Sequence, residues 1–583
     1  MSGRWNKTSR TVCCCYGVCI FRKYYKDNEG SYKLTTSLRE QALKFGKIKE
    51  VDGAAIILHA DVLEREFQGI KHCAEVGAYV NCGGAHGNTI CTISKVQITE
   101  IERTKRSNDG LEIVREERKV VTLSILGCAI NGKFNRGTKR LPTINCDTYF
   151  LSSDQVNQLI GIDLNEDKEH FCVTDSNDDD QTYLNLDKLM GRHTAILGTT
   201  GSGKSCTVAS IVQSILSSYE CPRILFFDIH NEYPSAFGYN DKEPNEDFKN
   251  RTNAIPWNDF TLPYWFLDLE EFFGVYNLEP GSNQKAIIKR LITKQKEIEA
   301  KKQNIDGVVV SADTPIFFSI DTLLDEIIAE KDSQSNATNK KPYESIILKL
   351  QSVRHDTRYS FLHRKIDNET SIVEYFEFIL GLSESEAYLN ILDLSGLPAE
   401  VRAVCVGVIS RLCFDFKYWD LDPESIPLNL ILEEAHTYIP EDSDSKFNIA
   451  KERVERIAKE GRKYGVGLTV VTQRPSNVST TVLSQCGTYI TLRLTNDLDQ
   501  NKIKRLLPDT LAGQVDFLPS LRDGEAFVSG DSINLPRKVQ FRVPNPMPRS
   551  NDVRYHKSWK LGKPETYSLK ALVDSWHKQD KSK

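Results

Sequence analysis

The 583-residue sequence lacks the segments that would carry a chain into or across a membrane. It has no run of about 18 uninterrupted apolar residues. Its first residues, MSGRWNKTSR, have no apolar core of the kind found in secretory signal peptides. We therefore expect a cytoplasmic protein with no membrane partner.

The sequence also lacks a regular cysteine pattern and an excess of positive charge. Its 15 cysteines are scattered, which in a large intracellular chain indicates reduced thiols rather than a disulfide framework. The one cluster, Cys13 to Cys15 with Cys19, is without the paired spacing of a zinc site. A net charge of -5 argues against a broad basic surface for nucleic acid. Any DNA-binding surface must therefore be local, such as a pore or a groove.

The length indicates two or three domains, because single hydrophobic cores stop growing at about 250 to 300 residues. Up to about residue 160, short alternating runs rich in β-branched residues, set between Gly and Asn turns, predict a small β-barrel or sandwich. Residues 35–72, ahead of these runs, have a more helical composition. The acidic stretch TDSNDDDQ then predicts an exposed linker over residues 161–184.

From Leu184 onward, apolar strand-like runs alternate with amphipathic helices, which predicts an α/β domain with a mainly parallel sheet over residues 185–543. Helical segments such as NQKAIIKRLITKQKEIEAKK interrupt it and predict a helical insertion at about residues 270–390. The polar, proline-containing residues 544–583 are predicted to form a C-terminal arm on the surface.

A phosphate-binding loop is the strongest local signal. GTTGSGKS matches the full GxxxxGK[ST] pattern between a predicted strand, HTAIL, and a predicted helix, SCTVASIVQSIL. Such a loop turns backbone N–H groups toward phosphates, its lysine neutralises the terminal phosphates, and its serine binds Mg²⁺. The predicted cofactors are therefore ATP and Mg²⁺, and the predicted ligand set is Gly198, Thr199, Thr200, Gly201, Ser202, Gly203, Lys204, Ser205 and Cys206.

Two further strands predict acids at the same edge of the sheet, where ligands bind. In NLILEEAH the apolar run is followed by Glu433, expected to hold Mg²⁺, and by Glu434, expected to polarise the attacking water. RILFFDIHNEY supplies Asp228 and Glu232 as candidates near the metal, although helix capping by Asp228 and a surface role for Glu232 are open alternatives. Gln473, at the end of GLTVVTQ, is expected to sense the γ-phosphate or merely to cap its loop.

These stretches, together with ILDLSGLP, IAKEGRKYGVGLTVVTQRPS and VLSQCGTYITLRLTND, resemble the HerA helicases and related FtsK-like DNA translocases over about residues 185–530. The resemblance implies a RecA-like P-loop motor preceded by a small β-barrel, in a homohexameric ring with DNA in the central channel. It also implies that Arg462 and Arg192 reach the ATP of a neighbouring subunit. Without the resemblance, Arg462 would be interpreted as part of the solvated face of its helix.

Two functions follow from the resemblance. In the first, the ring translocates DNA beside a separate nuclease. In the second, the ring is a scaffold that assembles and regulates an effector in antiphage defence, either a nuclease or a sirtuin-like NAD-consuming enzyme. Such an effector would be another polypeptide, docked on an extension of the N-terminal domain (residues 1–160). A protein-remodelling ATPase is a third possibility, disfavoured by the translocase-like motifs.

Overall fold

The computed structural model describes residues 25–26, 32–33 and 43–578, apart from residues 54, 68–69, 85–86, 108–109, 131–132, 139, 161–168, 176–180, 240–244, 279–282, 306, 308, 364–371, 383–386, 443–447, 551–554 and 562–567. The cysteine cluster at residues 13–19 lies outside the described residues. The chain divides into two compact units, Met1–Leu159 and Ile160–Lys583.

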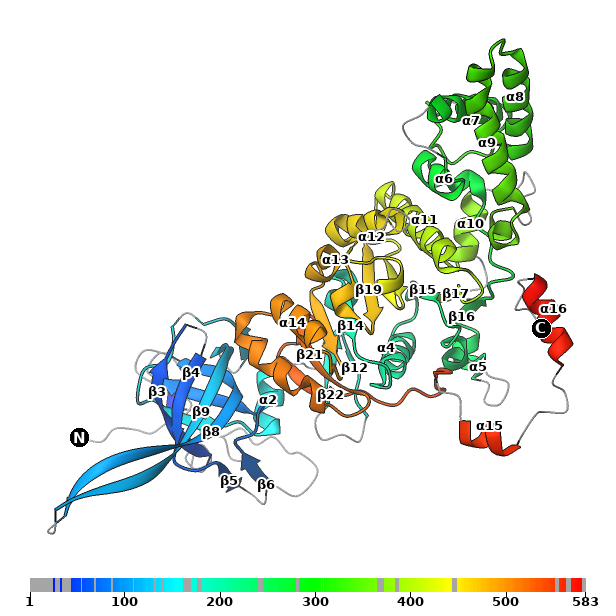
Figure 1. The fold of residues 1–583 in the computed structure, drawn as a ribbon. Coiled ribbons are helices and arrows are strands. Elements are labelled where there is room, and N and C mark those ends of the chain that lie inside the picture. The colour runs from blue at the N-terminus through cyan, green and yellow to red at the C-terminus, as the bar shows by residue number, and fades with distance from the viewer. Residues whose placement is uncertain are drawn as a thin grey trace. The chain divides into compact units, whose positions relative to one another are not determined.

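The first unit is built on a seven-stranded antiparallel sheet in the order β10-β9-β4-β3-β11-β7-β8. Because β8 also pairs with β9, the sheet closes on itself around a core that includes Phe45, Leu58 and Val121. The paired β8 and β9 also form a long hairpin that extends beyond the closed sheet (Figure 1). The strands are β3 Lys44–Val51, β4 Ala55–Ala60, β7 Tyr79–Gly84, β8 Gly87–Ser107, β9 Gly110–Ile130, β10 Lys133–Arg136 and β11 Asp147–Phe150.

The helical expectation for residues 35–72 is wrong for the described part of that range. It holds β3, β4, β5 (Glu64–Phe67) and β6 (Ile70–Cys73), while the unit's described α-helix, α2, comes later at Ser153–Ile160. The side chains of Ile56 and Leu58 alternate with less buried neighbours along β4, as a half-buried strand requires. Pairing with β3 and β9 outweighs the helix-favouring composition of this stretch.

The second unit is built on a nine-stranded sheet in the order β16-β17-β15-β18-β19-β14-β20-β21-β22. All neighbours from β16 to β20 are parallel, and β21 and β22 add an antiparallel edge. This confirms the predicted α/β class. The strands are β14 Thr194–Leu197, β15 Ile224–Asp228, β16 Thr252–Ile255, β17 Leu389–Asp393, β18 Leu428–Leu432, β19 Val466–Thr472, β20 Thr488–Thr491, β21 Glu525–Gly530 and β22 Arg537–Gln540.

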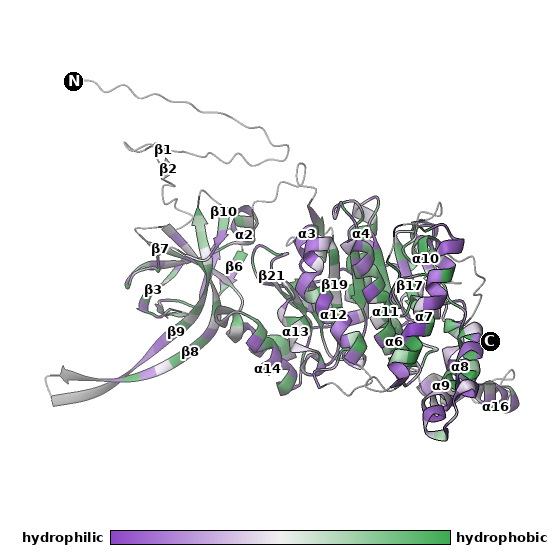
Figure 2. Cartoon of the chain, turned by 90° about the horizontal axis from the view of Figure 1, so that it is seen from above, coloured by the Kyte–Doolittle hydropathy of each residue, from purple (hydrophilic) through white to green (hydrophobic). Residues whose placement is uncertain are grey.

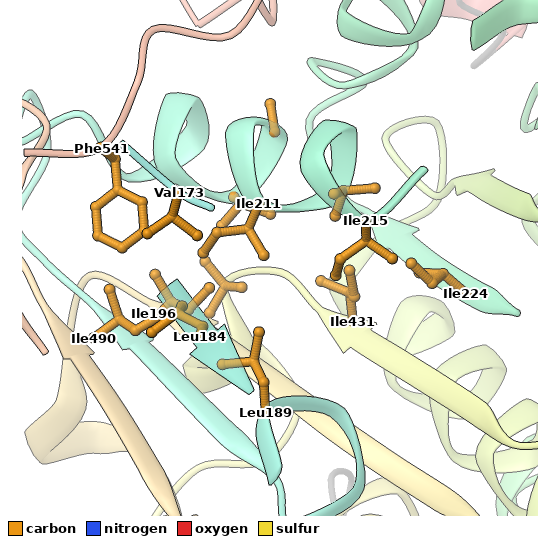
Figure 3. Close-up of a cluster of buried hydrophobic side chains, with 14 of the residues drawn as sticks. Val173, Leu184, Leu189, Ile196, Ile211, Ile215, Ile224, Ile431, Ile490 and Phe541 are labelled. Atoms are coloured by element: carbon orange, nitrogen blue, oxygen red, sulfur yellow. The ribbon is translucent and has the colours of Figure 1, made fainter. Parts of the chain in front are cut away.

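Helices cover the sheet, whose strands are largely hydrophobic (Figure 2). On the α4 side, Ile211 and Ile215 pack over Ile196, Ile431 and Ile490 from three parallel strands (Figure 3). The helices of this part are α3 Leu186–Gly191, α4 Lys204–Ser218, α5 Glu246–Lys249, α11 Ala399–Tyr418, α12 Asn448–Glu460, α13 Thr480–Ser484 and α14 Asp497–Leu506. Short 3-10 turns are η1 Pro234–Phe237, η2 Tyr264–Phe266, η3 Thr357–Leu362, η4 Ala435–Thr437, η5 Gly461–Tyr464, η6 Pro475–Asn477 and η7 Asp509–Ser520.

Between β16 and β17 the chain leaves the sheet and forms α6 Leu269–Val275, α7 Asn283–Lys302, α8 Ile320–Ser333, α9 Ala337–His355 and α10 Ile372–Ile379. Buried charges fasten α6 to the helices beside the sheet. Arg411 of α11 donates to both carboxylate oxygens of Glu271, at 2.7 and 2.8 Å, and Arg453 of α12 donates to Asp268 at 2.6 Å. Because Glu271 is fully buried, its bidentate partner satisfies a charge that would otherwise be costly.

The two ends of the second unit differ from the expected linker and arm. Within residues 161–184, β12 (His170–Cys172) pairs with β13 (Tyr183–Asn185), and Phe171 and Val173 belong to the core beneath α4. At the other end, Asn545 and Pro546 are hydrogen-bonded to Gln213 of α4. Only beyond these residues come the terminal helices α15 Tyr555–Leu561 and α16 Leu569–Lys578.

Among the described residues, no helix combines the length and hydrophobicity needed to span a lipid bilayer.

Candidate active site

The predicted phosphate loop lies between β14 and α4, at the carboxyl edge of the sheet. Gly201 and Gly203 adopt left-handed backbone angles, with φ of 77° and 88°, which curl the loop around the start of α4. Gly203 is the N-cap of α4 and supplies no side-chain cap. The first N–H groups of the helix, including that of Cys206, are therefore suited to an anion.

The loop is tightly packed against the segment that enters β21. Gly524 donates its backbone N–H to the carbonyl of Ser202 at 2.9 Å. A Cβ on Gly203 would lie 2.6 Å from the nitrogen of Gly524, and one on Gly198 would lie 2.6 Å from Oγ of Ser202. Thr199 is held from the other side, since its hydroxyl donates to the carbonyl of Arg493 at 2.9 Å. The loop is thus preformed by its surroundings.

Lys204 and Glu434 form a buried ion pair across the site. Nζ of Lys204 lies 2.5 Å from Oε1 of Glu434, and both side chains are 8% exposed. Glu434 follows β18 in a left-handed conformation, φ 44°, which is uncommon for a residue with a side chain and concentrates at functional sites. Burial alone would raise the pKa of Glu434, but hydrogen bonding from His436 and attraction to Lys204 lower it to about 2. Glu434 is therefore ionised at neutral pH.

Gln473 points to the same place from the end of β19. The hydroxyl of Thr200 donates to Oε1 of Gln473 at 2.5 Å, and the backbone N–H of Gln473 donates to Oε2 of Glu434 at 3.3 Å. Hydrogen bonds therefore link four residues that the sequence predicted for the site, namely Thr200, Lys204, Glu434 and Gln473.

A cluster of acids lies next to this group. The hydroxyl of Ser205 donates to Glu232 at 3.2 Å, and Glu433 accepts the backbone N–H of Ile229 at 3.2 Å. Burial is the main cause that raises the pKa of Glu433 well above its usual value, and the charges of Asp228 and Glu232 raise it further. Burial likewise raises the pKa values of Asp228 and Glu232. The three carboxylates are thus buried close to one another.

Asp228 has a clear structural task within this cluster. Its carboxylate accepts the backbone N–H groups of His230, Asn231 and Tyr233 at 2.7 to 3.1 Å and so caps the turn that follows β15. These contacts agree with a capping role for Asp228.

The donor set fits Mg²⁺. A serine hydroxyl and carboxylate oxygens are the hard ligands this ion prefers, and it usually takes one or two of them together with phosphate and water. In the described parts of the chain, no three side chains of His, Cys, Asp or Glu converge as a metal site of their own. Burial raises the pKa of Glu433, and the charges of Asp228 and Glu232 raise it further, so a cation beside Ser205 would favour the ionised form of Glu433.

The two predicted arginines lie at the opposite edge of the sheet. Arg192 precedes β14 and pairs with Asp531 at 2.8 Å, and Arg462 lies in η5 just before β19. Since β14 and β19 are parallel neighbours, both arginines lie near the amino ends of strands whose carboxyl ends carry the phosphate loop and Gln473. A four-residue strand spans about 13 Å. Arg462 is exposed and has no ion pair among the described residues.

Two histidines, to which the sequence assigned no role, lie beside the candidate residues. His436 contacts Glu434, with Nδ1 3.3 Å from Oε2, and also approaches Oγ1 of Thr472 at 3.1 Å. His193 is buried at the start of β14, and its Nδ1 accepts the N–H of Leu468 at 3.0 Å. Burial lowers the pKa of His193 to about 4, and the nearby Arg462 contributes to this shift. Both histidines stand within the stretches HTAIL and NLILEEAH, but a single sequence does not tell which residues of such stretches touch.

Comparison with known families agrees with this geometry. Residues 172–413 match the family described as "Helicase HerA, central domain", and residues 374–549 match "Helicase HerA-like C-terminal". The chain belongs to the HerA helicase family. The predicted enzyme class, a P-loop ATPase of the helicase type, is confirmed by this membership.

The curated relatives are distant in sequence but similar over long stretches. A probable helicase of Methanocaldococcus jannaschii is 28% identical over 62% of this chain and 64% of its own length. The DNA double-strand break repair helicase HerA of Sulfolobus acidocaldarius is 26% identical over 75% of this chain and 81% of its own length. That of Pyrococcus furiosus is also 26% identical, over 74% of this chain and 79% of its own.

Among solved structures, VirB4 of Thermoanaerobacter pseudethanolicus aligns with a TM-score of 0.44 at 15% identity, covering 67% of this chain and 99% of its own. The bacterial conjugative coupling protein TrwB, lacking its N-terminal 70 residues, aligns with a TM-score of 0.43 at 14% identity, covering 68% of this chain and 94% of its own.

The close packing at Gly203 generates a test of the preformed loop. Gly203→Ala should abolish ATP binding and destabilise the protein by about 1 to 3 kcal/mol, because the new Cβ meets the backbone of Gly524 in a left-handed conformation. Binding of a fluorescent ATP analogue and thermal melting measure the two effects. Gly137→Ala is the control, since Gly137 also has a positive φ but open space around it. Normal ATP binding by Gly203→Ala would contradict the preformed loop.

Proposed function

We propose that this protein is an ATP-hydrolysing DNA translocase or helicase of the HerA type that works as a closed ring, most simply a hexamer. One observation carries the proposal. The phosphate loop with Lys204 and Glu434 lies at one edge of the sheet, and the exposed Arg462 lies at the other. One copy of the chain therefore has half of a complete hydrolytic site at each edge.

In the proposed reaction, the phosphates of ATP bind the curled loop and the start of α4, and Lys204 turns from Glu434 to the terminal phosphate. Glu434 then loses part of its partner charge, so that burial raises its pKa toward a range useful for accepting a proton. Glu434 orients and deprotonates the attacking water. Gln473 senses the γ-phosphate through its hydrogen bond with Thr200. Mg²⁺, held through Ser205 and Glu433, would supply charge neutralisation at the phosphates, and Asp228 would keep Glu433 in place.

Arg462 completes the site of the next copy. A guanidinium beside the transferring phosphoryl group stabilises the charge that develops there, and an arginine of this kind can act in trans. The buried His193, close to Arg462 and bonded to β19, supports a fixed position for its turn. Arg192 is proposed as a second such arginine, released from Asp531 when copies meet.

The DNA role rests on the family and on charge. Relatives named as double-strand break repair helicases support DNA as the substrate, and the net charge of -5 restricts contact with it to a local surface such as the ring's channel. A separate effector polypeptide, whether a nuclease or an NAD-consuming enzyme, remains part of the proposal. In that case the N-terminal unit would be its docking place.

The roles of Lys204 and Glu434 are separable. Lys204→Ala should weaken ATP binding at least about a hundredfold, whereas Glu434→Gln should still bind ATP but hydrolyse it about 10² to 10⁴ times more slowly. Nucleotide titration and phosphate release measure the two quantities, and melting curves should show that both variants fold. Glu452→Gln, a change on the exposed face of α12, is the matched control. Wild-type hydrolysis by either active-site variant would refute the assignment.

The trans role of Arg462 predicts complementation. Lys204→Ala and Arg462→Ala proteins should each be inactive, while a mixture of the two should regain part of the activity. In a mixed ring, some interfaces join an intact phosphate loop to an intact arginine. ATPase assays over a series of mixing ratios, with the assembly state followed by mass measurement, make the test. A monomer that hydrolyses ATP at the full rate would end the trans assignment.

DNA binding should be independent of sequence and should weaken as salt rises, because it depends on contacts to phosphates. The measurement compares linear and closed circular duplexes at several salt concentrations, with the ATPase rate recorded in parallel. A preassembled ring should favour linear DNA, which offers an end. If neither DNA binds at low salt and neither changes the ATPase rate, the motor role is wrong and the effector scaffold becomes the better account.

A further inference from the structure

The loop that follows α11 is held rigidly by a buried lysine. Lys417, whose side chain is fully buried, pairs with Asp420, and Asp420 also accepts the hydroxyl of Ser425 at 2.8 Å and the N–H of Asp422 at 2.9 Å. The hydrogen bonds from Lys417, Asp422 and Ser425 lower the pKa of Asp420 to about 2. These contacts tie the loop from Asp420 to Ser425 to the end of α11.

This rigid loop presents two large apolar side chains to solvent. Trp419 is 79% exposed and Leu421 is 101% exposed. Large apolar residues on a preorganised surface are typical of binding hot spots, because little conformational entropy is lost when a partner covers them. We call Trp419 and Leu421 the loop pair.

The loop pair belongs to the same rigid part of the molecule as Arg462. The ring of Tyr418 contacts that of Trp419, with centroids 5.3 Å apart, and that of Tyr464, 5.2 Å apart. A Cβ on Gly465 would lie 2.6 Å from the carbonyl oxygen of Pro423, so the two loops are packed backbone against backbone. The turn of Arg462 and the loop that carries the loop pair are therefore packed against each other.

A second exposed apolar surface lies beside the nucleotide site, on the extended segment after β22. Here Pro544, Pro546 and Pro548 are buried, and the alternate residues point outward, with Val543 61% and Met547 54% exposed. We call Val543 and Met547 the strap pair.

The strap pair is fixed in place next to the phosphate loop. Gln213 of α4 binds the segment on both sides of the Asn545–Pro546 bond, and the hydroxyl of Ser235 donates to the carbonyl of Met547 at 3.0 Å. The N–H of Arg549 donates to the carbonyl of Glu232, whose carboxylate accepts the hydroxyl of Ser205.

We propose that the loop pair of one copy docks on the strap pair of the next copy around the ring. This inference rests on the proposed trans role of Arg462. Each apolar pair accompanies one half of the hydrolytic site, so the contact that brings Arg462 to a neighbour's nucleotide also brings the loop pair toward that neighbour's strap. The two surfaces differ, as a head-to-tail interface requires.

The test uses the full chain with charges placed in the two surfaces. Leu421→Asp and Met547→Lys should each raise the dissociation constant of the ring at least about thirtyfold, as expected for a hot spot. ATPase activity per subunit should fall in parallel and recover as protein concentration rises. Combining both substitutions in one chain should restore assembly, because the new carboxylate of one copy then faces the new ammonium of the next. Mass photometry over a concentration series measures assembly, and melting curves check folding.

Leu348→Asp is the matched control, because Leu348 is 68% exposed on α9, far along the chain from both pairs, and its substitution should leave assembly unchanged. A Leu421→Asp protein that assembles like the wild type overturns the proposal. So does failure of the double variant to assemble when both single variants dissociate. If the wild type never assembles, or Arg462→Ala is fully active, the proposed function itself fails. If the wild type assembles and Arg462→Ala is inactive while Leu421→Asp behaves normally, only the docking inference fails.

Discussion

The parallel alignment of β14 with β19 and β20, and of β18 with β19, is the constraint on which the rest of this molecule depends. In a parallel sheet all carboxyl ends lie at one edge and all amino ends at the other. The parallel sheet therefore brings the phosphate loop, Glu434 and Gln473 close together, although they come from three separate stretches of sequence. The same constraint carries Arg462 to the other edge. The direction of the strands thus places the candidate phosphate-binding residues at one edge of the sheet and Arg462 at the other.

Two groups of buried carboxylates in the second unit have different surroundings. Glu271 is fully buried, yet Arg411 satisfies both of its oxygens, which is how a protein accommodates a charge that only holds helices together. Burial raises the pKa values of all three carboxylates, but Glu433 and Glu232 lie beside other acids, whereas Glu271 faces an arginine. Acids crowded next to a preformed phosphate loop are candidates for a functional role.

The sequence predicted the elements whose signal is local. The run from Asn283 to Lys302 is a helix with the expected bounds, and the apolar runs around Phe226, Ile391 and Val470 are parallel strands. It failed where tertiary pairing overrides composition. Residues 44–60 contain good helix formers but close a sheet, and Phe171 lies in a stretch that acidic neighbours made resemble a linker.

The candidate site shows the same division. The residues of the phosphate loop and the acids after β18 follow from spacing and strand context alone. The partner of Ser205 does not, because Glu232 reaches it through the turn after β15, a geometry that no spacing rule gives. The shared contacts of His436 with Glu434 and Thr472 likewise depend on two strands lying side by side. Sequence indicates which residue types are present at an edge, while folding decides which of them touch.

The segment of alternating buried prolines, residues 543–549, belongs to the packed part of the second unit. Its composition looks like a tail, but it contacts Gln213, which is 4% exposed within α4. The side-chain carbonyl oxygen of Gln213 accepts the N–H of Asn545, and its amide nitrogen donates to the carbonyls of Pro546 and Ala236. A chain cut at residue 543 would leave the buried carbonyl oxygen of Gln213 without this partner, on the helix that begins at the phosphate loop. The packed part of the second unit therefore extends to about Arg549, where Gln213, Ser235 and the backbone of Glu232 hold the segment.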